Sequence, residues 1–170
     1  MTSGEVPDTA AAENSDDDGK TYTLDRSKAG SAMPDFVFAA PDGSDTRLTD
    51  FQGKPVVVNL WATWCAPCVA EMPTLDDLAS QYKGKVTILT ISQDSQGKDL
   101  VDPFFKGKNF KNLQAWLDPE NQFGFHYNTG MLPTTVLYDA QGKEVARVVG
   151  AMDWDSADGR KLVEEALSAA

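Results

Sequence analysis

Residues 56–68 read VVVNLWATWCAPC, and this stretch decides the fold. It opens with an almost unbroken apolar run rich in valine, the pattern of a strand that is covered on both faces of a parallel sheet. From residue 66 to 82, apolar side chains recur every three or four positions, which predicts a helix with one buried face and a kink at Pro73. Cys65 and Cys68 therefore lie where a central strand meets the start of a helix.

The segments on either side extend this pattern to an α/β domain. Residues 86–91 are a second buried strand, so strand, helix and strand form a βαβ unit. Upstream, a turn at residues 41–43 joins a hairpin of strands near 36–38 and 46–48. Downstream, we predict a helix at 97–108, a short strand at 113–117, a helix beginning at 118–119, a hairpin of strands 134–138 and 144–149, and a closing helix around 162–167.

Length and charge bound the organisation of the chain. Its 170 residues suffice for one domain with its own core and a short extension. The net charge is -11, and residues 1–20 hold six acidic side chains against one lysine. We predict an acidic flexible tail or linker at residues 1–20 and a single domain at 21–170. Because no basic stripe is present, the composition argues against nucleic acid as a partner.

The two cysteines are placed for thiol chemistry. Cys65 meets the unpaired N–H groups at the start of the helix, which favour its thiolate. Cys68 lies one turn further and can attack a mixed disulfide formed on Cys65. A bridge across so short a loop restrains little chain entropy, and a zinc site needs four ligands where this chain offers two Cys and one His. The motif therefore predicts thiol-disulfide exchange.

These motifs together resemble the thioredoxin superfamily and, within it, the bacterial TlpA-like and ResA-like thiol oxidoreductases. The resemblance extends from about Pro34 to Leu167 and leaves the tail uncovered. It implies a thioredoxin-like α/β fold with a mixed sheet flanked by helices, an added N-terminal β-hairpin and a central insertion at residues 93–128. The residues that carry it are 58–68, Glu71-Met72-Pro73, 132–135, 139–142 and Gly150.

The resemblance also implies roles for individual residues. Cys65 is the attacking thiol and Cys68 the resolving one, so the redox group is their own disulfide, with no cofactor and no metal. Pro133 is the cis-proline of a loop facing the pair, and the Leu132 backbone pairs with the bound substrate. The remaining substrate-binding candidates lie beside Cys65 and are Trp64, Ala66 and Pro67.

Two polar positions depart from ordinary thioredoxin. Asn59 stands six residues before Cys65, where thioredoxin has a buried carboxylate that handles the second cysteine's proton. Glu71 is the candidate replacement, since its i, i+3 spacing places it beside Cys68 on the helix. The competing interpretation is a solvated helix carboxylate, and on either view Glu71→Gln is expected to leave stability nearly unaffected.

The direction of electron flow follows from the dipeptide between the cysteines. Ala66 and Pro67 supply no donor that would stabilise the reduced thiolate, so a reductant is favoured over an oxidase. The resemblance implies a monomer that is periplasmic or extracytoplasmic and anchored to the membrane through a segment absent from this sequence. Its partners would be client proteins that receive copper, as in cytochrome oxidase, or haem, as in cytochrome c, with a membrane thiol-reducing conduit as electron donor.

A different class of function also fits the cysteine pair. A copper-binding metallochaperone module would use both thiolates as ligands, assisted by Met131 or Met152, although plain packing also accounts for these methionines. A peroxidase needs a single peroxidatic cysteine without a partner three residues on, so that interpretation is disfavoured.

Overall fold

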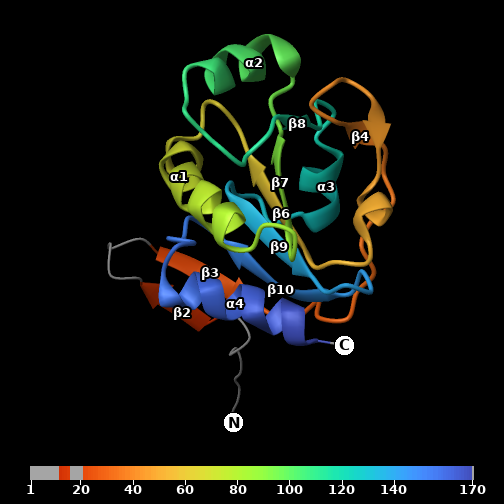
Figure 1. The fold of residues 1–170 in the computed structure, drawn as a ribbon, viewed down its shortest axis with the longest axis vertical. Coiled ribbons are helices and arrows are strands. Elements are labelled where there is room, and N and C mark those ends of the chain that lie inside the picture. Colours follow the sequence, from red (N-terminus) through yellow and green to blue (C-terminus); the bar gives the residue numbers. More distant parts are fainter. Residues whose placement is uncertain (1–11, 16–20, 170) are drawn as a thin grey trace.

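The computed structural model describes residues 12–15 and 21–169, and its centre is strand β6 (Val56–Trp61). Every residue of β6 is buried, as the apolar run predicts. It pairs in parallel with β7 (Thr87–Ser92) and antiparallel with β9 (Thr134–Tyr138). The fold is therefore built outward from the strand that leads into the cysteines (Figure 1).

The described residues form a nine-stranded mixed sheet in the order β2-β3-β10-β9-β6-β7-β8-β4-β5. On one side of the central strands, β9 and β10 make the predicted hairpin. On the other, β8 links the core strands to the small β4–β5 hairpin, which is the expected N-terminal addition. The flanking strands are β2 (Ala12–Ser15), β3 (Thr21–Asp25), β4 (Phe38–Ala39), β5 (Asp45–Thr46), β8 (Trp116–Leu117) and β10 (Glu144–Val149).

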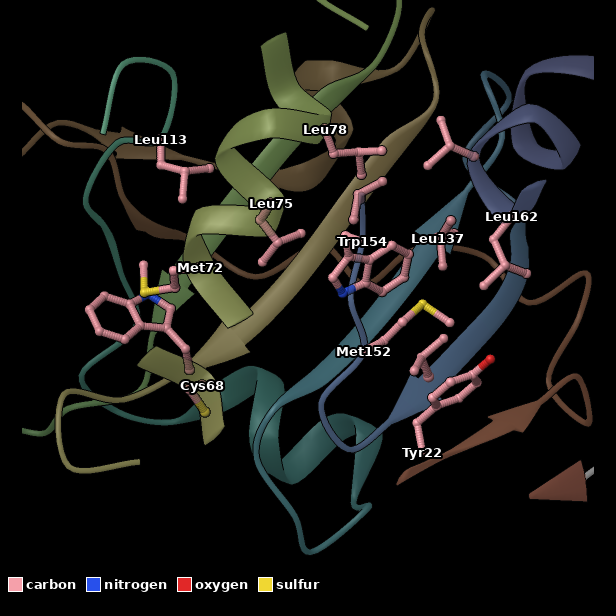
Figure 2. Close-up of a cluster of buried hydrophobic side chains, with 14 of the residues drawn as sticks. Tyr22, Cys68, Met72, Leu75, Leu78, Leu113, Leu137, Met152, Trp154 and Leu162 are labelled. Carbon is pink, nitrogen blue, oxygen red and sulfur yellow. The ribbon is translucent and has the colours of Figure 1, made fainter. Parts of the chain in front are cut away.

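Helices cover both faces of this sheet. On one face, α1 (Ala66–Gln81), α2 (Lys98–Lys106) and α4 (Ala157–Ser168) enclose a buried cluster. Figure 2 shows Met72, Leu75 and Leu78 along α1, with Cys68 in line at its start. On the other face, α3 (Gln122–Tyr127) packs against the opposite side chains of β6 and β9. Burial of both faces explains why β6 reads as continuously apolar.

Several element boundaries differ from the predicted ones. The hairpin strands are shorter than predicted, because Leu48–Phe51 form a 3-10 turn (η1) in place of the end of the second strand. The strand predicted at 113–117 is confined to β8. Helix α3 begins four residues after Asp118, whose carboxylate accepts hydrogen bonds from the backbone N–H groups of Gln122 (3.1 Å) and Phe123 (2.9 Å). Asp118 thus caps the helix from a preceding turn.

The predicted tail is described only in part. Residues 12–15 form β2, which pairs antiparallel with β3. The other residues of 1–20 lie outside the described residues, as does residue 170, so the division at residue 20 stays a prediction. Within the part of the chain that the structure describes, no helix combines the length and apolar character needed to cross a membrane.

Candidate active site

The cysteine pair lies at the end of β6, where the chain enters α1. Cys65 is the N-cap residue of the helix, its Cα lies 5.3 Å from that of Cys68, and the two are joined by a disulfide. The Cys65 sulfur accepts a hydrogen bond from the backbone N–H of Cys68 at 3.3 Å. Cys65 is 6% exposed and Cys68 is fully buried, so an incoming disulfide reaches Cys65 first.

A groove of about 760 Å³ opens beside Cys65. Three large apolar side chains on its walls face solvent: Trp64 (72% exposed), Phe125 (76%) and Met131 (53%). Among the described residues, none that lines this groove carries a charged side chain, although the whole chain has a net charge of -11. Exposed apolar patches rimmed by polar groups mark contact surfaces. The groove is therefore suited to an uncharged peptide segment next to the reactive sulfur.

The loop that faces the disulfide contains a cis peptide bond. The Leu132–Pro133 bond is cis, as the resemblance implied, and Pro133 is buried. Met131 and Leu132 line the groove on this side, while the Pro133 carbonyl accepts a hydrogen bond from Gly150 N at 2.9 Å. The loop is thus fixed to the end of β10 and lines the same groove as Cys65.

Glu71 is not a solvated carboxylate. Its side chain is fully buried and accepts hydrogen bonds from three donors on two segments, strand β6 and the loop between β10 and α4. Asn59 Nδ2 donates to one oxygen at 3.1 Å, and Met152 N (2.9 Å) and Trp154 Nε1 (3.0 Å) donate to the other. The interpretation of Glu71 as a surface residue is wrong, and the carboxylate is held in one orientation in the core below the disulfide.

Comparison with known proteins agrees with this geometry. The redoxin family model matches residues 28–165 of the chain. The chain belongs to the redoxin family. Thiol-disulfide oxidoreductase ResA of Oceanobacillus iheyensis is 36% identical over 155 residues, which cover 88% of this chain and 77% of that protein. The chain is therefore a ResA-like thiol-disulfide oxidoreductase, and the resemblance inferred from its motifs is confirmed.

Two solved structures with the same fold belong to proteins described as exposed or secreted. The exposed lipoprotein thioredoxin Etrx1 of Streptococcus pneumoniae has a TM-score of 0.67 and 30% identity, covering 77% of this chain and 99% of that one. A secreted disulfide oxidoreductase of Mycobacterium tuberculosis, homologous to DsbE of E. coli, has a TM-score of 0.64 and 26% identity, covering 77% and 96%. The thioredoxin-like fold predicted for this redoxin is thus confirmed.

The structure brings most of the predicted site residues of this redoxin together. Trp64 and Leu132 line the groove with Cys65, and Ala66 and Pro67 form the exposed first turn of α1 beside it. The two methionines lie in different places. Met131 lines the groove, whereas Met152 is buried and its backbone N–H donates a hydrogen bond to Glu71.

Sequence reasoning missed three site residues of the redoxin. Phe125 lines the groove from α3, and its neighbours gave no signal that this face of a short helix stays exposed. Trp154 lies in the loop before α4, and its ring N–H contacts Glu71, 83 residues away in sequence. Asp94 binds the loop before Cys65, and the aligned ends of β6 and β7 are the signal that could have found it.

Proposed function

We propose that this enzyme reduces disulfides in bacterial proteins outside the cytoplasm and so prepares cysteine pairs for copper or haem. The single observation that carries the proposal is the accessible Cys65 at a helix N-terminus beside an uncharged groove, with Cys68 buried behind it. The lipoprotein and secreted neighbours support the compartment. Haem and copper sites in client proteins both require reduced cysteines, which such an enzyme supplies.

The reaction moves two electrons from the enzyme to the client. The Cys65 thiolate attacks one sulfur of the client disulfide, forming a mixed disulfide and releasing a client thiolate. The Cys68 thiolate then attacks the Cys65 sulfur, which restores the enzyme disulfide and releases the second client thiolate. Both client thiolates take up a proton, one originating from Cys68 and the other from the solvent. A membrane thiol-reducing conduit would return two electrons to the enzyme disulfide.

Glu71 is proposed to take the proton from Cys68 when the mixed disulfide resolves. The two residues are separated by one helical turn, so their side chains emerge on the same face of α1. Asn59, the Met152 backbone and the Trp154 ring fix the carboxylate in place, which is the pre-organisation that a general base requires. Glu71 would therefore replace the titratable group that Asn59 cannot provide.

The direction of electron flow is proposed from the first turn of α1. Ala66 and Pro67 are exposed and offer no side-chain donor to the Cys65 sulfur, and Pro67 also lacks a backbone N–H. The thiolate is then stabilised by the helix N-terminus alone, which favours a potential nearer the -270 mV of thioredoxin than the -120 mV of a strong oxidant.

Client binding is proposed to use the groove and the cis-proline loop together. An extended client segment would pair with the Leu132 backbone and rest its apolar side chains on Trp64, Ala66 and Pro67. We expect the enzyme to act as a monomer, with no nucleic acid as partner.

The test compares disulfide reduction with copper binding. A peptide carrying an oxidised Cys-x-x-Cys-His motif, the haem attachment sequence, is mixed with the reduced enzyme and the release of its thiols is followed. Cu(I) is titrated into the reduced enzyme in parallel. The proposal predicts stoichiometric reduction of the peptide. Tight binding of one Cu(I) per chain without any peptide reduction would overturn it and favour the metallochaperone.

A further inference from the structure

A buried carboxylate outside the cysteine motif holds the loop that leads into Cys65. Strands β6 and β7 are parallel, with Trp61 opposite Ser92 at their last residues. Two positions beyond each strand end, Thr63 and Asp94 therefore also face each other. One Asp94 oxygen accepts a hydrogen bond from Thr63 N at 3.0 Å, and the other accepts one from Thr63 Oγ1 at 2.7 Å. The carboxylate thus ties the two strand ends together.

The Asp94 carboxylate has almost no contact with solvent. Asp94 is 1% exposed, and its second bond partner is the Ser92 hydroxyl, which donates at 2.7 Å and accepts from Asp94 N at 3.0 Å. A charge enclosed in this way is screened far less by water and salt than a surface charge. Its field therefore reaches the neighbouring residues of the loop.

We propose that the charge of Asp94, held in place by Thr63, sets the proton affinity of the Cys65 thiol and thereby the reducing strength of the enzyme. This rests on the proposed role of Cys65 as attacking thiol. Asp94 lies 3.0 Å from Thr63 N and two residues span at most about 7 Å, so the carboxylate lies within about 10 Å of the Cys65 backbone nitrogen and within about 14 Å of the Cys65 sulfur. A like charge at that distance disfavours the thiolate and opposes the helix N-terminus. A less stable thiolate makes the reduced enzyme a stronger donor of electrons.

A second buried carboxylate, that of Asp118, lies near the end of β7, where Asp118 N donates to the Ser92 carbonyl at 2.9 Å, and its oxygens accept from the backbone at the start of α3. Among the described residues lining the groove with Cys65, the other titratable side chain is Tyr127, whose pKa burial raises well above its ordinary value. The first turn of α1 contains no acidic residue. Within α1, Cys68 and Glu71 lie on the core side, where three donors from two segments hold the glutamate. Asp94 is the carboxylate attached to the loop that carries Cys65.

The test measures the pKa of the Cys65 thiol and the reduction potential of the enzyme in two variants. Alkylation rate against pH, in a Cys68→Ser background, reports the Cys65 pKa; equilibrium with a thiol buffer reports the potential of the two-cysteine enzyme. Asp94→Asn keeps the shape and removes the charge, so the acid dissociation constant of Cys65 should rise about tenfold and the potential should become less reducing. Thr63→Val removes one hydrogen bond and keeps the charge, so both values should stay near those of the parent.

The outcomes separate this proposal from a structural role and from the proposed function. If Asp94→Asn lowers the unfolding midpoint but leaves the Cys65 pKa and the reduction potential unchanged, Asp94 has only a structural role and the proposal is wrong. If that variant does not fold, the ¹³C carboxyl resonance of Asp94 in the parent serves instead. It should shift as Cys65 titrates, and a constant resonance overturns the proposal. Failure of the parent to reduce clients would contradict the proposed function and leave these readouts intact.

Discussion

The two sides of the disulfide reverse the usual distribution of side chains. On the groove side, Trp64, Phe125 and Met131 expose apolar surface to water. On the core side, Asn59 and Glu71 are polar and fully buried, and Asn59 Oδ1 has no hydrogen-bond partner among the residues that the structure describes. The exposed apolar side chains and the buried polar ones each lower the stability of the fold, because folding favours burial of apolar groups and exposure of polar groups.

This difference indicates a division of labour between the two cysteines. In the proposed mechanism Cys65 meets the client, which fits its apolar and uncharged groove. Cys68 would act only after the mixed disulfide has formed, which fits its full burial on the side of the buried Glu71 carboxylate. Exposed apolar and buried polar side chains are expected at functional sites. Here they lie on opposite sides of the Cys65–Cys68 disulfide.

Removing the buried carboxylate should have the largest effect. Glu71→Gln should slow resolution of the mixed disulfide by about 10²-fold or more, because the general base is lost. It should also lower the free energy of unfolding by about 1 to 3 kcal/mol, because the new amide N–H₂ replaces one oxygen and so faces either the Asn59 donor or the donors from Met152 and Trp154. The burial of Glu71 thus corrects the expectation that stability would be nearly unaffected. Stopped-flow resolution kinetics and urea unfolding measure the two effects.

The matched control for Glu71 is Asp77→Asn, an exposed carboxylate on the same helix. It should leave both the resolution rate and the unfolding free energy at the parent values. Equal resolution rates for Glu71→Gln and the parent from acid to neutral pH would remove Glu71 from the mechanism.

Removing apolar surface from the groove should have a smaller and more selective effect. The double variant Phe125→Ser, Met131→Ser should lower kcat/KM for a protein client by about tenfold, because client side chains lose buried contact area. Reduction of a small disulfide such as oxidised glutathione should hardly change. Leu100→Ser, an exposed apolar residue on α2 outside the groove, is the control and should change neither rate. A matching loss for both substrates would point to damage at the cysteines instead.

The smallest effect concerns a buried carboxylate on the groove side. Burial raises the pKa of Asp118 above its ordinary value of 3.8, although hydrogen bonds from Phe123, Gln122 and Gln93 oppose the shift. The folded state therefore binds the Asp118 proton more tightly, so this contribution to stability is complete below pH 3.8 and is lost as pH rises through the raised pKa. The parent's unfolding free energy minus that of Asp118→Asn should fall with rising pH. A difference that grows with pH would reverse the assigned shift.

The sequence predicts the scaffold of the site better than its polar contacts. Val56–Trp61 and Thr134–Tyr138 were located because strand periodicity and apolar runs are local signals. Helix α3 was placed too early because Asp118 caps it from four residues away. The contact of Trp154 with Glu71 joins residues 83 apart, and only packing of the chain around α1 creates it.

The division of labour between Cys65 and Cys68 is tested most directly by trapping the mixed disulfide. The reduced Cys68→Ser enzyme is mixed with an oxidised client, quenched with acid and digested, and the cross-linked peptides are sequenced by mass spectrometry. The account predicts client joined to Cys65 in nearly every cross-link, while Cys65→Ser with Cys68 intact yields almost none, because Cys68 is fully buried. Client recovered on Cys68 at a comparable rate would contradict the assignment of the exposed and buried sides.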